Sequence, residues 1–529
     1  MNRWLGLVGL LVVAAAALAL RLPSLDRRPL HNDEAVNAVK FSALWETGRY
    51  AYDPEEYHGP ALHYATLPFV ALSGARSTSD LSDTRLRLAP VFFGTALVLL
   101  LALFADGLSW RATIFAGLLT AISPAMVFYS RYFIHETLLV FFTTLTIAAG
   151  WRWWSLRKLS WAMLAGAALG LMYATKETFV IPLAAMVAAT ALTGGWCRNE
   201  EAGQPWLGSV RERALAFMVA AWKPLLVALA VAVAVSLVLF TSFFTNWQGP
   251  LDSIKSYLPW LNRAGGQSPH LHPWSFYLER LLWFHQPRGP VGSEGLIVVL
   301  AVAGAIRGFT GGGSVGINRN LVRWLAYYTV ALTAAYSLIP YKTTWCLLGF
   351  WQPMILLAGV GAVAALEAVR SRWAKIAVAA LLLAAAGQLA WQAYRASYLL
   401  ASDWRNPYTY SQTRPNVHEL VARVQGLAQV HPDGQAMVVK VMVPESYWPL
   451  PWYLRQLARV GWWDALPDDP YAPVVIASVR LGAALDEKSG KKWIAAGAYE
   501  LRPGVYLELF VEFELWKRFV ATLARDREE

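Results

Sequence analysis

The sequence predicts a polytopic α-helical membrane protein with a small soluble α/β domain at its carboxy-terminal end. Of its 529 residues, 56% are hydrophobic and 15% are charged, whereas soluble domains carry about 25% charged residues. Apolar segments long enough to cross a bilayer, roughly 20 residues, recur along most of the chain. The 26 tryptophans are typical of a protein with many membrane–water boundaries. This composition excludes disordered, collagen-like and disulfide-rich secreted proteins, since the chain has only 2 cysteines.

About eleven segments are predicted to span the membrane. They are long and apolar, and they lie at 3–21, 85–105, 112–129, 136–152, 160–174, 178–194, 215–243, 293–307, 322–339, 344–366 and 374–393. The first is interpreted as a retained anchor, because no small-residue cleavage site precedes Arg27 and Arg28 and more spans follow.

The charges of the loops predict the orientation in the membrane. The segment 22–84 contains nine acidic and five basic residues, whereas the loops that alternate with it are basic. Because cytoplasmic loops are enriched in Lys and Arg, we expect the amino terminus in the cytoplasm of a multi-pass protein of the plasma (inner) membrane. The loops 22–84 and 244–292 and the carboxy-terminal domain are then extracytoplasmic.

The chain changes character after residue 394. Residues 1–394 form the predicted transmembrane domain, and 395–529 the predicted soluble domain. Turn signals separate three predicted strands, which are Ala436–Val443, Pro473–Ser478 and Val505–Val511. Two predicted helices, 416–429 and 513–525, flank them.

The net charge of +11 belongs to the membrane part, because the tail has sixteen basic and sixteen acidic residues. Basic cytoplasmic loops therefore account for the charge, and no nucleic-acid partner is expected. The Gly-rich stretch Thr310–Gly316 lacks the Lys-Ser/Thr of a phosphate-binding loop and is interpreted as a cytoplasmic linker.

The first external loop opens with His31-Asn32-Asp33-Glu34. An apolar helical pattern follows and ends at Gly48, and Asp33 is predicted to cap that helix. An N-cap together with favourable charge at the helix dipole is the structural explanation for two acids at a helix start. A functional site is the alternative, and the neighbouring external segments favour it.

Other ionisable residues gather on the same predicted face. They are His58 and His63 in the first loop, Arg131 and Glu136 before the fourth span, Lys176 before the sixth, and Lys342 before the tenth. Each has a structural alternative: Arg131 and Glu136 as an ion pair, and the two lysines as residues whose ammonium groups extend to the membrane interface. All nine histidines also fall on this side: 31, 58, 63, 135, 270, 272, 285, 418 and 431. Together these residues suit acid–base chemistry on a lipid-linked phosphate.

The chain resembles the GT-C superfamily of integral-membrane glycosyltransferases. Asp33-Glu34 after the first span looks like the acid pair of protein O-mannosyltransferases and aminoarabinose transferases. Ser130-Arg131 with Glu136 is similar to the second acidic motif, where an Asp is commoner at the position of Glu136. Thr175-Lys176 looks like the lysine motif before the sixth span. HNDEA, YDPEEYHGP and YKTTWC are similar to a prokaryotic subfamily of flippase-activity-associated glycosyltransferase-like proteins.

This resemblance implies transfer of a sugar from a polyprenyl-phosphate donor to an unknown acceptor (protein, lipid or glycan) on the extracytoplasmic side, with inversion. It makes Asp33 the general base, and Glu34 and Glu136 residues that orient the acceptor. Where a divalent metal such as Mg²⁺ or Mn²⁺ is used, Asp33, Glu34 and Glu136 would hold it. The residues expected to bind the donor phosphate are Lys176, Arg131, His58 and Lys342. Those expected at the acceptor side or cleft rim are His31, His63, His270 and His272, with the amphipathic stretch 251–261.

Two other functions stay open from the sequence. A transporter of a lipid or polyprenyl-linked glycan also has polytopic helices, but its ionisable residues tend to lie near the midplane of paired repeats. The sequence shows no such repeat. A non-catalytic flippase partner is the third alternative, because Glu136 departs from the commoner Asp.

Overall fold

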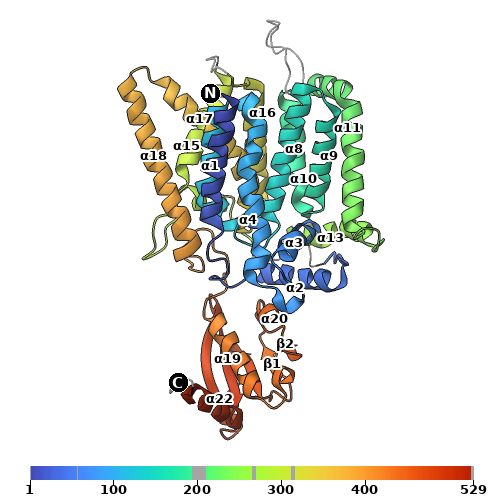
Figure 1. Cartoon of the computed structure of the whole chain (residues 1–529), viewed down its shortest axis with the longest axis vertical. Coiled ribbons are helices and arrows are strands. Elements are labelled where there is room, and N and C mark those ends of the chain that lie inside the picture. Colours follow the sequence, from blue (N-terminus) through green and yellow to red (C-terminus); the bar gives the residue numbers. More distant parts are fainter. Residues whose placement is uncertain (1, 56–57, 194–209, 265–269, 311–315, 526–529) are drawn as a thin grey trace.

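The computed structural model describes residues 2–55, 58–193, 210–264, 270–310 and 316–525. Cys197 and most of the predicted Gly-rich linker lie outside these ranges. The molecule is elongated, with a bundle of long helices at one end and a sheet domain at the other (Figure 1). A helix bundle with a small carboxy-terminal sheet agrees with the predicted fold class, whereas the predicted division of the chain at residue 394 stays a prediction.

In its described residues, each segment predicted to span the membrane contains at least one helix. The bundle helices are α1 (Arg3–Arg21), α4 (Asp83–Leu100), α5 (Ala105–Leu108), α6 (Trp110–Ile122), α7 (Pro124–Tyr129), α8 (Glu136–Leu156), α9 (Leu159–Tyr173), α10 (Val180–Thr193), α11 (Val210–Phe240), α15 (Gly295–Phe309), α16 (Arg319–Leu338), α17 (Leu348–Ala368) and α18 (Arg372–Tyr394). Among the described residues, five helices are long and apolar enough to cross a membrane by length and composition, and several shorter apolar helices accompany them. The predicted total of about eleven crossings stays a prediction.

The predicted span 112–129 is two helices rather than one. α6 ends at Ile122, and α7 begins with Pro124 at its first position. Proline has no backbone N–H, so it fits a first helical turn but not a helix interior. The Ser123 hydroxyl accepts a hydrogen bond from the Met126 N–H and caps the second helix.

Small residues bring the central helices close together. A Cβ on Gly361 of α17 would lie 1.8 Å from the carbonyl oxygen of Leu300 in α15, and one on Gly304 would lie 2.0 Å from that of Leu357. Only glycine permits this approach, which is the packing expected between helices in a bilayer.

Short helices lie between the bundle and the sheet domain, including α2 (Asn32–Thr47), α3 (Ala61–Leu72) and α13 (Tyr257–Ala264) (Figure 1). The predicted helix after Asp33 is confirmed as α2, and it ends at Gly48 with φ of 67°. The predicted cap is wrong. His31 caps α2 through its ring, which accepts from the Asp33 N–H, while Glu34 accepts from the His31 N–H. The Asp33 carboxylate is therefore left for other contacts.

The carboxy-terminal domain is a five-stranded mixed sheet with the order β2-β1-β3-β5-β4. The three predicted strands are β1 (Val438–Met442), β3 (Val474–Ser478) and β5 (Val505–Glu512), and the two predicted helices are α19 (Val417–Val430) and α22 (Phe513–Arg525). Sequence reasoning missed β2 (Arg459–Trp463) and β4 (Trp493–Arg502). β2 is a short edge strand with no buried residue, and β4 is interrupted by Gly497, so neither shows clean alternation.

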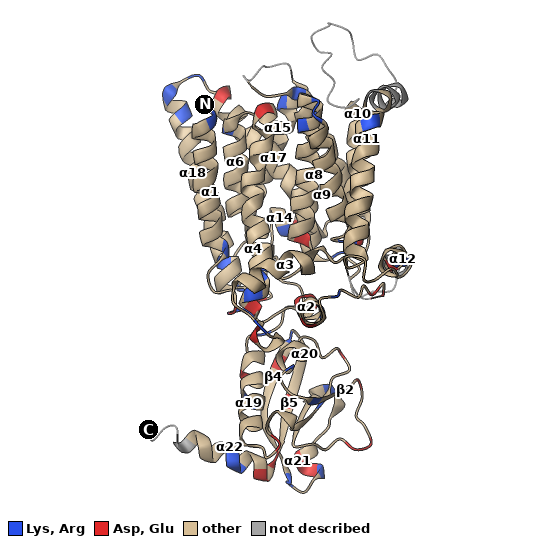
Figure 2. Cartoon of the chain, turned by 45° about the vertical axis from the view of Figure 1, so that its right-hand side comes forward, with Lys and Arg blue, Asp and Glu red and all other residues tan. Residues whose placement is uncertain are grey.

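One short helix of the sheet domain, α20 (Leu450–Tyr453), docks on the bundle. The Trp452 indole and the Tyr453 hydroxyl both donate to the Asp83 carboxylate, at 2.8 and 2.7 Å. The Tyr453 hydroxyl also accepts from the Leu30 N–H at 2.7 Å. Lys and Arg gather at the opposite end of the bundle (Figure 2), which is the distribution that predicts a cytoplasmic face there.

Candidate active site

A cavity of about 220 Å³ lies at the end of the bundle that faces the sheet domain. The start of α2, the loop before α3 and the loops before α8, α10 and α17 contribute to it. The residues that line it are Asp33, Val36, Asn37, His58, Ile134, His135, Glu136, Lys176, Thr178, Ile181, Trp260, Tyr336, Ile339, Tyr341, Thr343, Trp345 and Cys346. Four predicted site residues, Asp33, His58, Glu136 and Lys176, thus share one cavity, although they lie far apart in the sequence.

Asp33 supplies an accessible carboxylate to this cavity. Its side chain is 50% exposed, and the nearest basic atom, Nδ1 of His31, lies 3.8 Å from its Oδ1. In the described part of the chain, no hydrogen bond to the Asp33 carboxylate is formed. Burial lowers the pKa of the His31 imidazole. Because His31 is therefore neutral at neutral pH, it does not neutralise Asp33.

Glu136 and Lys176 form a buried ion pair in the cavity wall. The Lys176 Nζ donates to Oε1 of Glu136, and their side chains are 7% and 6% exposed. Burial alone lowers the pKa of the Lys176 ammonium, but the adjacent Glu136 carboxylate raises it above its ordinary value. Lys176 is therefore a permanent cation whose position Glu136 holds.

His58 is held by a second acid. Its Nδ1 donates to Oε2 of Glu177 at 2.7 Å, and the Tyr52 hydroxyl donates to Oε1 of the same carboxylate at 2.9 Å. The next residue, Gly59, packs directly on the loop that carries Lys176. A Cβ on Gly59 would lie 2.2 Å from the carbonyl oxygen of Ala174, so only glycine lets the two loops meet.

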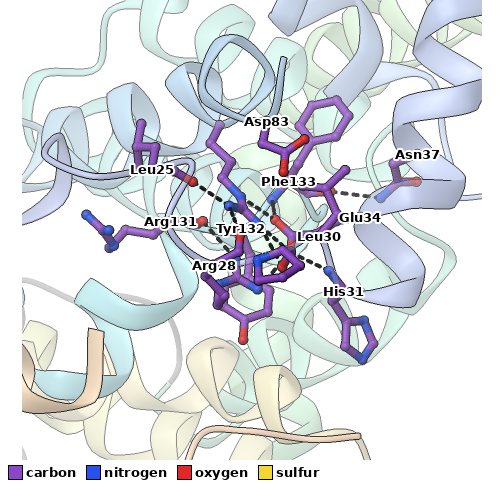
Figure 3. A network of polar contacts seen from close by, with 12 residues as sticks. Leu25, Arg28, Leu30, His31, Glu34, Asn37, Asp83, Arg131, Tyr132 and Phe133 are labelled. Carbon is purple, nitrogen blue, oxygen red and sulfur yellow. Dashed lines mark hydrogen bonds and ion pairs between the residues drawn. The ribbon is translucent and has the colours of Figure 1, made fainter. Parts of the chain in front are cut away.

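Glu34 does not line the cavity. Its side chain is fully buried and receives hydrogen bonds from the guanidiniums of Arg28 and Arg87 at 2.7–2.8 Å (Figure 3). The backbone N–H groups of His31 and Phe133 also donate to it, each at 2.9 Å. Burial raises the pKa of the Glu34 carboxyl, but the two guanidiniums outweigh it and bring the pKa to about 2. This carboxylate anchors the start of α2 to the loop before α8.

Two of the predicted phosphate ligands also lie away from the cavity. Arg131 donates to the carbonyl oxygens of Arg21, Pro23 and Ser24 and to the Tyr398 hydroxyl. Lys342 donates to the carbonyl oxygens of His272 and Ile339. Its neighbours in sequence, Tyr341 and Thr343, line the cavity instead.

The histidines predicted at the rim divide into two groups. His31, His270 and His272 meet at Tyr410: His31 donates to its carbonyl oxygen, and the other two share hydrogen bonds with its hydroxyl. His63 is buried instead, with its ring stacked on Tyr50 at 4.8 Å and 5.7 Å from the ring of His135.

Sequence reasoning assigned no role at the site to Tyr410, His135 or Glu177. Tyr410 lies in a loop without periodicity, so no sequence signal pointed to it. His135 and Glu177 are direct neighbours of Glu136 and Lys176, and that adjacency was the available signal.

Comparisons with known proteins agree with this architecture. A model of the family described as dolichyl-phosphate-mannose-protein mannosyltransferase matches residues 64–246. No curated protein gives a significant match. Among solved structures, ArnT from Cupriavidus metallidurans bound to undecaprenyl phosphate is similar over 96% of this chain and 98% of that chain, with a TM-score of 0.58 and 17% identity. The Archaeoglobus fulgidus oligosaccharyltransferase tethered to an acceptor peptide covers 96% of this chain and 74% of that chain, with a TM-score of 0.55 and 13% identity.

The chain has the GT-C fold. The family match and this fold together indicate a membrane glycosyltransferase of the GT-C superfamily, as the sequence resemblance predicts. The sheet domain is included in the similarity, because ArnT is matched over nearly its whole length.

The predicted metal ligands are the carboxylates of Asp33, Glu34 and Glu136, and their surroundings show whether they could hold an ion together. An Archaeoglobus fulgidus oligosaccharyltransferase structure contains Zn and sulfate, with a TM-score of 0.52, 13% identity, and coverage of 90% of this chain and 68% of that chain. Here Glu34 is bound by two arginines and Glu136 by Lys176. Among the described residues, no three His, Cys, Asp or Glu side chains are grouped to hold a metal ion. The set Asp33, Glu34 and Glu136 is therefore not assembled in this structure.

Proposed function

We propose that the protein transfers a sugar from a polyprenyl-phosphate-linked donor to an acceptor hydroxyl, with inversion, on the extracytoplasmic side. The observation that carries this proposal is the cavity in which the accessible Asp33 carboxylate faces the same space as Lys176 and His58. Such a cavity offers a base together with the Lys176 cation and the His58 imidazole. Its remaining wall is largely apolar and aromatic, which suits a sugar and the first units of a polyprenyl chain.

In the proposed reaction, the acceptor oxygen attacks the anomeric carbon of the donor sugar while Asp33 takes the hydroxyl proton. The bond between that carbon and the phosphate oxygen breaks, and the electron pair leaves with polyprenyl phosphate. Attack from the side opposite the leaving group inverts the configuration. The phosphate is already an anion, so it needs positive charge rather than a proton donor.

Lys176 and His58 are the proposed ligands of the donor phosphate. Both already hold a carboxylate partner, Glu136 and Glu177, at the wall of the cavity. Those partners fix the positions of the two side chains before the donor arrives. Glu34 is proposed as a positioning residue, which keeps the start of α2, and hence Asp33, in place through Arg28 and Arg87.

The test is transfer of radiolabel from a polyprenyl-phosphate sugar by the purified full-length protein. Removing a general base typically lowers the rate about 10²–10⁴-fold, and we expect this for Asp33→Asn. Asp26→Asn is the matched control, because Asp26 is an exposed acid of the same loop outside the cavity. Wild-type rates in Asp33→Asn would refute the assignment of the base. Lipid scrambling in vesicles without transfer from any donor would favour the transporter instead.

A further inference from the structure

A second cavity, of about 410 Å³, lies at the same end of the bundle and is rich in arginine. It is formed by the loop after α1, the start of the loop before α8, and the chain that leaves α18 toward the sheet domain. Its lining residues are Ser24, Leu25, Arg27, Arg28, Arg87, Arg131, Ser397, Tyr398, Leu399, Ala401, Ser402, Asp403, Arg414 and Pro415. It shares no lining residue with the cavity of Asp33.

The arginines of this cavity are only partly neutralised. Arg28 and Arg87 share the single carboxylate of Glu34, and Arg414 pairs with Glu500 at 2.9 Å. The one lining acid, Asp403, pairs with Arg405 outside the cavity. Within the described ranges, Arg27 and Arg131 form no ion pair. The cavity therefore carries an excess of positive charge.

Because most of these arginines are buried, their excess positive charge is energetically unfavourable unless an anion is bound. Arg131 is 7% exposed, and its guanidinium donates to carbonyl oxygens and to the Tyr398 hydroxyl and lies 4.3 Å from the centroid of the Tyr398 ring. The fully buried Arg21 lies nearby and donates to the carbonyl oxygens of Ala17, Thr120 and Ala121. Buried cations are ordinarily paired, because an isolated buried charge is strongly unfavourable. The planar guanidinium of arginine also donates bidentate hydrogen bonds to phosphate oxygens.

Two further features point to a ligand here. Within the part of the chain that the structure describes, the buried hydroxyls of the lining residues Ser397 and Ser402 have no hydrogen-bond partner. The segment Arg395–Leu399, which lines the cavity, is a π-helical turn, and such turns are frequent at functional sites.

The neighbouring surface suggests where the anion comes from. Leu22 and Leu399 are about half exposed, at 44% and 52%. Trp391 and Tyr394 stack at 5.8 Å on the end of α18, and such aromatic pairs are typical of the membrane–water interface. A lipid in the bilayer can therefore place its acyl chains against these helices while its phosphate enters the cavity.

We propose that this second cavity binds the phosphate head group of an anionic membrane lipid. Bound phosphate would neutralise the excess charge of Arg27, Arg28 and Arg131. Since Arg28 and Arg87 also hold Glu34, the lipid would stabilise the anchor of α2. Glu34 adjoins Asp33 in sequence, so the head group and the active site share one structural support.

The experiment titrates the purified full-length protein with short-chain phosphatidylglycerol and follows Tm. Phosphatidylcholine of the same chain length and inorganic phosphate form the other two arms. We expect a saturable rise in Tm with phosphatidylglycerol alone. Each basic residue near a lipid surface contributes about a five-fold change in affinity, so Arg27→Gln should raise the Kd about five-fold and Arg27→Glu about thirty-fold.

Arg76→Gln is the matched control, because Arg76 is an exposed arginine in another loop at the same end of the bundle. It should leave the Kd unchanged. Equal Kd values for wild type, Arg27→Gln and Arg27→Glu would overturn the site. A rise in Kd for Arg76→Gln as large as that for Arg27→Gln would also overturn it. A full rise in Tm with inorganic phosphate alone would overturn the lipid as the source of the anion. The readout involves no sugar transfer, so it stands apart from the test of the catalytic function.

Discussion

At the scale of single residues, two adjacent carboxylates have different surroundings. Asp33 is half exposed in a cavity, whereas Glu34 is fully buried between Arg28 and Arg87. The sequence predicts both as site residues, because adjacency gives no sign of which side of the helix start each one takes. Arg87 lies 53 residues away in α4, so the pairing depends on tertiary structure.

Glu34→Gln should destabilise the protein strongly. It leaves two buried guanidiniums without their carboxylate, and breaking a buried ion pair costs about 3–5 kcal/mol. Thermal unfolding in detergent measures this, and Asp33→Asn is the matched control, expected to keep the wild-type Tm. An unchanged Tm in Glu34→Gln would contradict the anchoring role.

The pH dependence of this contribution follows from the pKa of Glu34, about 2 in the folded protein. A carboxyl with a lowered pKa stabilises the fold above its unfolded pKa, roughly 4.3, and loses that effect as pH falls through the folded value. The Tm difference between wild type and Glu34→Gln should therefore be constant from pH 8 to 5 and shrink toward pH 2. A difference that changes between pH 8 and 6 would contradict this assignment.

Lys176→Met should weaken donor binding about ten-fold or more, since a hydrogen bond to a charged group contributes about 1.5–3 kcal/mol. Lys342→Met is the informative comparison. Lys342 was also a candidate from sequence, after Lys176, Arg131 and His58, but its ammonium contacts backbone carbonyls and does not line the cavity. The Lys342→Met variant should bind the donor with an affinity within about two-fold of wild type in a polyprenyl-phosphate binding assay. A larger loss in Lys342→Met than in Lys176→Met would reverse the roles.

At the scale of elements, the site depends on loops that meet at glycine and at helix ends. Gly59 brings the loop of His58 onto the loop of Lys176, with its N–H donating to the Thr175 carbonyl oxygen at 3.2 Å. The motifs could be recognised in the sequence because each lies next to an apolar span. The distances between the motifs could not be predicted, since they depend on how the helices pack.

Gly59→Ala should lower both stability and transfer. Its Cβ would collide with backbone, so the loops must separate, and overpacking of this kind costs about 1–3 kcal/mol. Gly387→Ala in α18 is the control, because a Cβ there meets nothing within 4 Å. Transfer rates and Tm of the two variants check this. Wild-type behaviour of Gly59→Ala would show that the close approach is not required.

At the scale of the whole molecule, the sequence predicted a helix bundle, a small carboxy-terminal sheet and most of their elements. Apolar length identified the bundle, and alternating β-branched runs identified the central strands of the sheet. The docking of the two parts was not predictable, because it rests on Trp452 and Tyr453 reaching Asp83 across more than 360 positions. The same contact holds the start of the loop that carries Asp33, at Leu30.

Replacing Trp452 and Tyr453 together by Phe should loosen this docking. The double variant removes both donors to Asp83 and the acceptor for the Leu30 N–H. Hydrogen exchange around Leu30 should then accelerate while the strands of the sheet keep their protection. Tyr471→Phe is the control, since Tyr471 packs on Trp493 within the sheet domain. Unchanged exchange at Leu30 in the double variant would contradict the role of the contact.

The central claim is that one cavity binds the donor while Asp33 performs the proton transfer. The most direct measurement compares donor binding and single-turnover sugar transfer in the same Asp33→Asn protein. We predict a Kd for the polyprenyl-phosphate sugar within about two-fold of wild type and a transfer rate reduced at least about 10²-fold. A transfer rate close to wild type, or a loss explained entirely by weaker binding, would contradict it.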